Sequence, residues 1–204
     1  MESHRLKSDP YNLVIAGVGG QGNVLASKVL AAMLVRQGLN VTIGETFGAT
    51  QRGGSVMSHL RISRTGPWSP LMPKNRAHAI VGLEPIEALR VLAQYGNPEV
   101  LVIANNRPVH PVGVICGDNE YPSPGEIATL LGTLSRRHCL LAATDEAARL
   151  GSAILANIVL IGALAATDVL PLDREAFSAV IASMMPGKKE INLKAYDLGG
   201  QMIS

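Results

Sequence analysis

The feature that most constrains this chain is a glycine-rich stretch near its N-terminus, Gly17-Val18-Gly19-Gly20-Gln21-Gly22. An apolar run at residues 13–16 precedes it, and a segment with helical spacing of apolar residues follows it. Strand, glycine turn and helix in this order favour phosphate binding. Glycine permits the tight turn, and the helix start offers unpaired N–H groups and the positive end of its dipole to an anion. The alternative is a turn of the same shape that binds no ligand.

Apolar runs of strand length alternate with helical patterns along the rest of the chain. We expect strands at residues 11–16, 41–43, 56–62, 77–83, 100–103, 112–116 and 139–143. We expect helices at residues 21–37, 123–134, 144–150, 152–167, 173–185 and 193–198, and a further helix that begins at residue 85. This alternation predicts one domain over residues 1–204, a three-layer α/β/α fold with a mainly parallel, mixed sheet and a Rossmann-like glycine turn. The first two strands are expected to form a parallel pair with a right-handed crossover.

A second glycine-containing loop, residues 50–55, follows the second expected strand. Because the carboxyl ends of parallel strands meet at one edge of a sheet, we expect this loop to lie beside the glycine turn. The planar guanidinium of Arg52 suits a phosphate, Gly53 and Gly54 let backbone N–H groups approach closely, and Ser55 adds a hydroxyl. The alternative is an ordinary surface loop with a solvated arginine.

Lys28 is a second candidate cation for the same anion. It lies six residues beyond Gly22, which is about 9 Å along a helix at the usual rise. Helical side chains lean back toward the helix N-terminus, so its ammonium group is expected to reach an anion held at the turn. A solvated lysine with no ligand contact is the alternative interpretation.

The expected strand at residues 56–62 alternates between apolar and polar positions. Its polar face carries His59 and Arg61, and we expect this face to lie near the ligand edge, with packing or a subunit interface as the alternative. A catalytic histidine needs a partner that orients it, and the sequence names none. No catalytic residue is therefore assigned.

Composition excludes several classes of function. A net charge of +2 and an aromatic content of 3% argue against nucleic-acid binding. Cys116 and Cys139 are too far apart for a metal or iron–sulfur motif, so no metal site is predicted, and both are expected to be buried thiols. The apolar stretch at residues 153–166 is too short to span a membrane, which predicts a helix buried all round or shared with a partner. The absence of an apolar leader favours the cytoplasm.

Several motifs occur here in the order in which one known family has them. Besides the glycine turn, they are Gln-Arg-Gly-Gly-Ser-x-x-Ser-His-Leu-Arg at residues 51–61, Leu83-Glu84-Pro85-x-Glu87, Asn105-x-Arg107-Pro108, Ala156-Asn157 and Asn192-Leu193-Lys194-Ala195. From about residue 11 to residue 198 the chain resembles the small gamma-type subunit (domain III) of the 2-oxoacid:ferredoxin oxidoreductases. Within that family it is most similar to the beta subunit of indolepyruvate ferredoxin oxidoreductase.

This resemblance implies a complex that decarboxylates a 2-oxoacid, indolepyruvate or another aryl-pyruvate, to its acyl-coenzyme A and passes electrons to ferredoxin. The thiamine diphosphate and iron–sulfur clusters of that chemistry are expected in a larger partner subunit. In single-chain pyruvate members the matching domain helps to hold coenzyme A. The resemblance therefore implies a coenzyme A site at Gly17, Gly19, Gly20, Gln21, Gly22, Lys28, Arg52, Gly53, Gly54, Ser55 and Asn105.

The sequence also departs from the family pattern. The single-chain members carry a lysine pair where Thr50 and Gln51 stand here, so Arg52 supplies the charge from a different position. Gly117-Asp118-Asn119 lacks the third glycine of a thiamine diphosphate motif. The chain is therefore expected to be inactive without its partner.

Two other classes of function stay open at this point. Glu45 lies 23 residues after Gly22, near the position of the ribose-binding carboxylate in dinucleotide-binding domains, which favours a nucleotide (NAD or FAD)-binding dehydrogenase domain. The third possibility is a non-enzymatic module that uses the fold for protein association.

Overall fold

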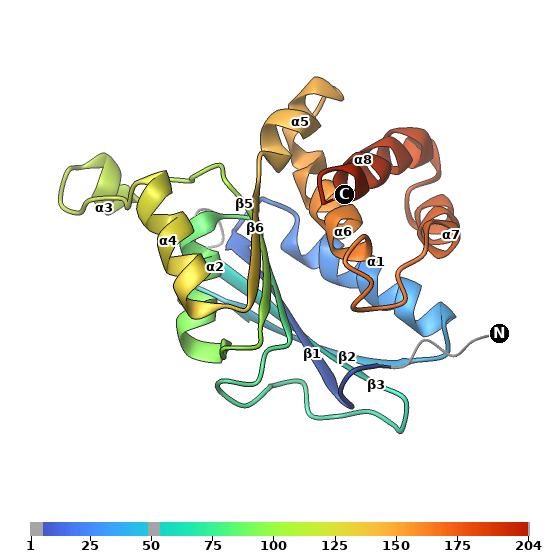
Figure 1. Ribbon diagram of the computed structural model, residues 1–204. Coiled ribbons are helices and arrows are strands. Elements are labelled where there is room, and N and C mark those ends of the chain that lie inside the picture. The colour runs from blue at the N-terminus through green and yellow to red at the C-terminus, as the bar shows by residue number, and fades with distance from the viewer. Residues whose placement is uncertain (1–5, 49–53, 204) are drawn as a thin grey trace.

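The computed structural model describes residues 6–48 and 54–203. Within these ranges a six-stranded sheet has the order β2-β3-β1-β4-β5-β6 (Figure 1). Its strands are β1 (Tyr11–Val18), β2 (Asn40–Phe47), β3 (Ser55–Ser63), β4 (Ala79–Gly82), β5 (Leu101–Asn105) and β6 (Arg137–Leu141). The strands β1, β4, β5 and β6 pair in parallel, and β3 pairs antiparallel with β1 and β2. The predicted mixed, mainly parallel sheet is confirmed.

The predicted pairing of the first two strands is wrong. β2 runs in the same direction as β1, but β3 lies between them and pairs with both along its length. Strands that follow one another closely in sequence tend to pair as antiparallel neighbours, and β3 follows β2 in this way. Since β1 and β2 share a direction, their carboxyl ends still lie at one edge of the sheet.

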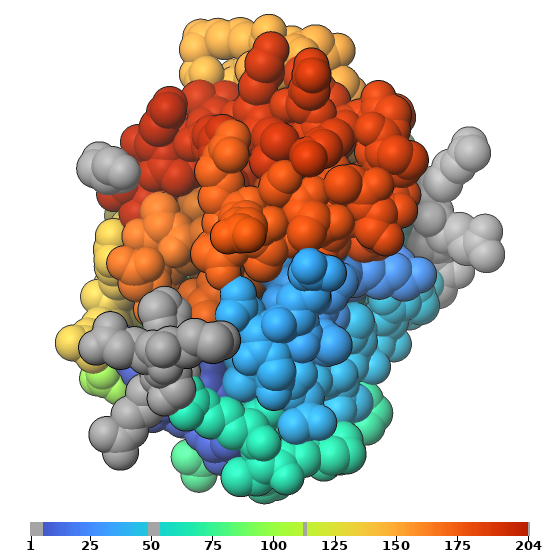
Figure 2. Space-filling view, turned by 90° about the vertical axis from the view of Figure 1, so that its right-hand side faces the viewer, coloured from blue at the N-terminus to red at the C-terminus, as the bar shows by residue number. Residues whose placement is uncertain are grey.

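One face of the sheet is covered by the helices α1 (Asn23–Arg36), α6 (Ala156–Ala165), α7 (Arg174–Met184) and α8 (Lys189–Gln201). Leu30 and Met33 of α1 and Ile158 of α6 pack in the core on this face of the sheet. Helices α7 and α8 pack on α1 and α6 as an outer layer, where Phe177 stacks on Tyr196. The short helices α5 (Ala143–Arg149) and η1 (Ala153–Leu155) lead from β6 to α6, and η2 (Pro186–Lys188) connects α7 to α8. Figure 2 shows α7 and α8 on the outside of this layer, with α1 below them.

The apolar segment expected at residues 152–167 is η1 followed by α6, and its burial comes from the chain itself. Every residue from 157 to 164 is buried. Helix α8 approaches α6 closely because Gly162 and Gly199 stand at the crossing. A Cβ on Gly162 would fall on the carbonyl oxygen of Tyr196, and one on Gly199 on that of Val159. The first expected alternative, a helix buried all round, is confirmed, and α6 leaves no apolar face for a partner.

The other face carries α2 (Pro85–Tyr95) and α4 (Pro124–Leu134), which pack on β1, β4, β5 and β6. No helix of the described chain covers β2 and β3 on this side. The connection at residues 64–78 lies there instead, and a Cβ on Gly44 of β2 would come within 2.9 Å of the carbonyl oxygen of Pro70. The helix predicted at residues 123–134 is confirmed as α4, and Ser123 and Glu126 form a reciprocal capping box at its start.

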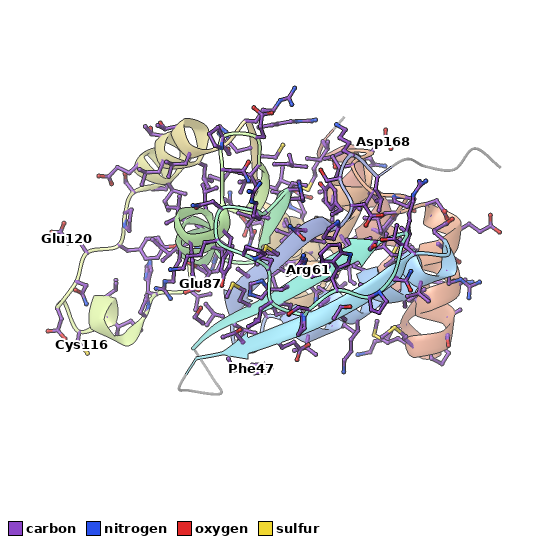
Figure 3. All side chains as sticks on the ribbon, turned by 90° about the horizontal axis from the view of Figure 1, so that it is seen from below. Phe47, Arg61, Glu87, Cys116, Glu120 and Asp168 are labelled. Carbon is purple, nitrogen blue, oxygen red and sulfur yellow. The ribbon has the colours of Figure 1, made fainter. Side chains whose placement is uncertain are left out.

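Residues 106–123 form an arm that links β5 to α4 and projects from the body, with Cys116 and Glu120 toward its far end (Figure 3). The strand predicted at residues 112–116 is wrong, because a short helix, α3 (Val112–Ile115), stands there. The amide groups of Val114 and Ile115 donate to the carbonyl of Pro111, and proline is well placed to start a helical turn. Cys116 is exposed and Cys139 is half-buried, so the expected burial of both thiols is also wrong.

The contact between α6 and α8 generates a stability prediction. Gly162→Ala places a methyl group against helix backbone that cannot yield without separating the two helices. We expect a loss of at least about 1–3 kcal/mol in the free energy of unfolding, the usual cost of overpacking. Gly187→Ala is the matched control, because no atom lies within 4 Å of a Cβ there. Urea denaturation of the two variants measures the difference, and equal midpoints would contradict the close crossing.

Candidate functional site

The sheet has a topological switch point between the carboxyl ends of β1 and β4. The chain leaves β1 into α1 on one face, and it leaves β4 into α2 on the opposite face. Open α/β sheets bind ligands where neighbouring strands feed helices on opposite faces. The glycine turn lies on one side of this switch point and the segment from Leu83 to Glu87 lies on the other.

The glycine turn leads from β1 into an uncapped helix. Gly20 and Gly22 have φ angles of 104° and 83°, in the left-handed region that favours glycine. Gly22 is the N-cap of α1, no side chain caps the helix, and its first turn carries no acidic residue. The first N–H groups of a helix have no intrahelical acceptor, and those of α1 have no hydrogen-bond partner among residues 6–48 and 54–203. This arrangement suits an anion.

The side chain of Gln21 braces the turn from inside. Its Oε1 accepts a hydrogen bond from Val18 N at 2.8 Å, and its Nε2 donates to Leu83 O at 3.2 Å. Gly17 makes room for this brace, since a Cβ there would come within 2.7 Å of Gln21 Oε1 and 2.9 Å of Leu83 Cβ. Gly17 and Gln21 were both predicted to contact the ligand, and in the structure their contacts hold the turn in shape.

The described part of the second loop lies beside the glycine turn, as expected. Gly19 N donates to Gly54 O at 2.9 Å, so the two loops are joined directly. The hydroxyl of Ser55 donates to Glu87 Oε2 at 2.5 Å, and Glu87 also pairs with Arg90 at 2.9 Å. Figure 3 places Glu87 on α2, near the end of the sheet where β2 finishes at Phe47. The predicted residues Arg52 and Gly53 lie outside the described residues.

Asn105 ties the ends of two strands and a helix together. Its Nδ2 donates to Leu83 O at 3.2 Å and to Thr144 Oγ1 at 2.7 Å, and its Oδ1 accepts from Thr144 N at 3.2 Å. The residue is 1% exposed. Asn105 was predicted to contact the ligand at this edge. In the structure its amide nitrogen donates to two acceptors inside the protein instead.

Two further residues at this edge were not predicted as part of the site. Asn157 of α6 approaches the carbonyl oxygens of Gln21 and Gly22, each at 3.4 Å from Nδ2, and a Cβ on Gly22 would collide with that nitrogen. Glu84 caps α2 and is 1% exposed. Two features of the sequence could have identified these residues, a single asparagine in an apolar helix and a Glu-Pro pair at a helix start.

Glu84 also fixes both ends of the arm. Its Oε1 accepts hydrogen bonds from Val109 N at 3.2 Å and from the hydroxyl of Tyr121 at 2.5 Å. Burial, followed by the hydrogen bond to Glu84, raises the pKa of Tyr121 well above its usual range. Tyr121 therefore stays protonated and continues to donate.

Lys28 lies on the exposed side of α1, and it has no ion pair among the described residues. Its ammonium group is therefore not committed elsewhere in that part of the chain. The structure places it on the helix that starts at the glycine turn, as the sequence predicts.

His59 and Arg61 are not at the ligand edge, so that expectation is wrong. His59 is fully buried in the middle of β3, with its ring 4.9 Å from that of Tyr95, and burial together with Arg61 lowers its pKa. Arg61 lies nearer the opposite edge and donates to Leu71 O at 2.9 Å (Figure 3). Arg61 holds the connection at residues 64–78 over the sheet, and His59 packs against Tyr95 of α2, which is the packing alternative.

The topology also separates Glu45 from the glycine turn. Glu45 is exposed on the edge strand β2, opposite Ser58 of β3, and β3 stands between β2 and β1. In dinucleotide-binding folds the ribose-binding carboxylate follows the strand next to the first one. The intervening strand therefore removes the main support for a dehydrogenase domain.

Residues 6–48 and 54–203 contain neither a cluster of potential metal ligands nor a helix able to span a membrane. No three His, Cys, Asp or Glu side chains gather there in a way that would hold a metal ion. No helix in these ranges has both the length and the hydropathy of a membrane-spanning segment.

Comparison with known sequences agrees with this geometry. A family described as pyruvate ferredoxin/flavodoxin oxidoreductase matches residues 12–202. The chain is 38% identical over 189 residues to the indolepyruvate oxidoreductase subunit IorB of Archaeoglobus fulgidus, and the match covers 92% of each chain.

Solved structures with the same fold are also similar. The gamma subunit of a keto/oxoacid ferredoxin oxidoreductase from Geobacter sulfurreducens matches with a TM-score of 0.66 at 21% identity, over 95% of this chain and 98% of that one. A 2-oxoglutarate:ferredoxin oxidoreductase from Magnetococcus marinus, with 2-oxoglutarate, coenzyme A and succinyl-CoA bound, matches with a TM-score of 0.73 at 20% identity, over 97% of this chain and 31% of that one. At these identities the likeness establishes the fold.

The internal role of Asn105 generates a second prediction. Asn105→Ala leaves Thr144 N without its acceptor and removes one of the two hydrogen bonds to Leu83 O. An unsatisfied buried group of this kind costs about 1–3 kcal/mol. We expect the free energy of unfolding to fall by roughly that amount. Asn106→Ala, at the exposed neighbouring position, should leave it unchanged. Denaturation of both variants gives the comparison, and equal losses at the two positions would show that Asn105 is not a structural tie.

Proposed function

Because the chain belongs to the pyruvate ferredoxin/flavodoxin oxidoreductase family, we propose that it is the small subunit of a 2-oxoacid ferredoxin oxidoreductase of the indolepyruvate type. Relatives that it matches at 38% identity over more than nine-tenths of their length are indolepyruvate oxidoreductase subunits. In this proposal residues 1–204 form one domain that holds the phosphates of coenzyme A and assembles with a larger subunit.

The observation that carries the proposal is the joined pair of loops at the switch point. Gly22 opens an uncapped α1, and Gly19 N binds Gly54 O, which brings the second loop to the same place. A diphosphate at this point would meet the N–H groups of the first turn and the positive end of the helix dipole. Lys28 on α1 and Arg52 in the second loop would supply two cations.

The reaction itself needs more than this chain offers. Oxidative decarboxylation of a 2-oxoacid releases CO2, joins the acyl group to the thiol of coenzyme A, and delivers two electrons to ferredoxin. We assign the thiamine diphosphate and the iron–sulfur clusters for these steps to the larger subunit, since no set of metal-binding side chains gathers in the described residues. The work of this chain is then to anchor the nucleotide end of coenzyme A while its thiol reaches the partner.

The test uses the reconstituted complex with Lys28→Ala and Arg52→Ala variants of this subunit. Charge-assisted hydrogen bonds are worth about 1.5–3 kcal/mol, so each variant should raise the KM for coenzyme A about ten- to a hundredfold, at about 1.4 kcal/mol per decade. The decarboxylation half-reaction without coenzyme A should stay near the wild-type rate. Steady-state kinetics with varied coenzyme A provides the measurement.

Arg36→Ala is the matched control, since Arg36 is an exposed cation in the last turn of the same helix. Its KM for coenzyme A should equal that of the wild type. Unchanged KM values for both Lys28→Ala and Arg52→Ala would refute the proposed site.

A further inference from the structure

A cavity of about 340 Å³ opens at the base of the arm, beside the carboxyl ends of β4 and β5. Ligand pockets span about 300–1,000 Å³, so this one suits a single ring system better than a whole cofactor. Four prolines, a tyrosine and two aliphatic side chains supply most of its walls. The lining residues are Pro85, Asn106, Pro108, His110, Tyr121, Pro122, Ser123, Pro124, Ile127 and Leu140.

The cavity has few polar groups that are free to bind a ligand. The hydroxyl of Tyr121 is taken by Glu84, and Ser123 is taken by the capping box with Glu126. Among the described residues, the side chains of Asn106 and His110 make no hydrogen bond or ion pair, although the His110 ring lies 5.0 Å from that of Tyr121. A largely apolar cavity with two free polar side chains, Asn106 and His110, therefore remains.

The position of the cavity relates it to the glycine turn. Pro85 follows the end of β4 and Asn106 follows the end of β5, while β1 ends at the turn. Neighbouring strands lie about 4.8 Å apart, so the tip of β5 is about 10 Å from the tip of β1. The carbonyl of Leu83 accepts from both Gln21 and Asn105, which confirms that these strand ends are close. A nucleotide spans a distance of this size between its phosphates and its base.

We propose that this cavity binds the adenine ring of coenzyme A. The inference rests on the proposed function, because it places the phosphates at the glycine turn. Flat apolar walls pack against both faces of a purine, and the amide of Asn106 can pair with adenine, as asparagine does when it donates and accepts at N7 and N6. The nucleotide then crosses the tips of β4 and β5, from the α1 side of the sheet to the α2 side.

The hydrogen-bonding groups of the cavity also predict which bases it binds weakly. The carboxamide of Asn106 would accept a hydrogen bond from the N6 amino group of adenine and donate one to N7. Hypoxanthine and guanine carry an oxygen at the six-position, which accepts hydrogen bonds and cannot donate one to the carboxamide oxygen. Coenzyme A with hypoxanthine in place of adenine should therefore bind more weakly, by about tenfold. This preference is a property of the cavity alone, because the diphosphate is the same in both compounds.

The experiment measures the KM for coenzyme A in the reconstituted complex. Asn106→Ala and His110→Ala should each raise it, about tenfold for Asn106→Ala, with kcat at saturating coenzyme A unchanged. The KM for pantetheine, which lacks the nucleotide, should not move. Asn119→Ala is the matched control, an exposed asparagine on the same arm outside the cavity. A coenzyme A analogue with 8-azidoadenine should label the peptide of residues 106–124 on irradiation.

The outcomes separate the two proposals. If Lys28→Ala raises the KM for coenzyme A while Asn106→Ala and His110→Ala do not, the adenine site is wrong and the phosphate site stands. If none of the three variants raises it, both are wrong. Photolabelling confined to the partner subunit would overturn the adenine site. Protection of the cavity from solvent by the partner alone would also overturn it, because a partner side chain would then fill the cavity.

Discussion

The carbonyl of Leu83 is the point on which the arrangement of this edge depends. It accepts hydrogen bonds from Gln21 Nε2 and Asn105 Nδ2, each at 3.2 Å, and so ties the ends of β1, β4 and β5 together. Gln21 in turn holds the glycine turn, and Asn105 holds the start of α5 through Thr144. Since the three strand ends cannot move independently, the donors of α1 keep a fixed position relative to α2 and to the arm.

The polar residues at the edge divide into those that build it and those left for a ligand. Gln21, Ser55, Glu84 and Asn105 have partners inside the protein, and so does the N–H group of Gly19. The first turn of α1, Lys28 and Asn106 have no such partners in the described chain. A family resemblance points to all of these positions together. Their hydrogen bonds separate the two groups, and Gln21 and Asn105 of the motifs belong to the scaffold.

Much of this site could be predicted from the sequence because its signals are local. A strand, a glycine turn and a helix specify their own geometry. Gly54 lies beside Gly19 for another reason, because β3 starts at Ser55 and Ser55 pairs with Val18 at the end of β1. The insertion of β3 between those strands is a long-range choice that no local pattern encodes. The burial of His59 and Arg61 follows from that choice and from the connection at residues 64–78, which covers polar positions that alternation assigned to the surface.

The structure of the assembled complex with coenzyme A bound tests the phosphate site most directly. We expect diphosphate oxygens within hydrogen-bonding distance, about 2.7–3.2 Å, of backbone nitrogens in the first turn of α1, with Lys28 directed toward them. Coenzyme A phosphates held only by side chains of the larger subunit, away from Gly19 to Gly22, would contradict it.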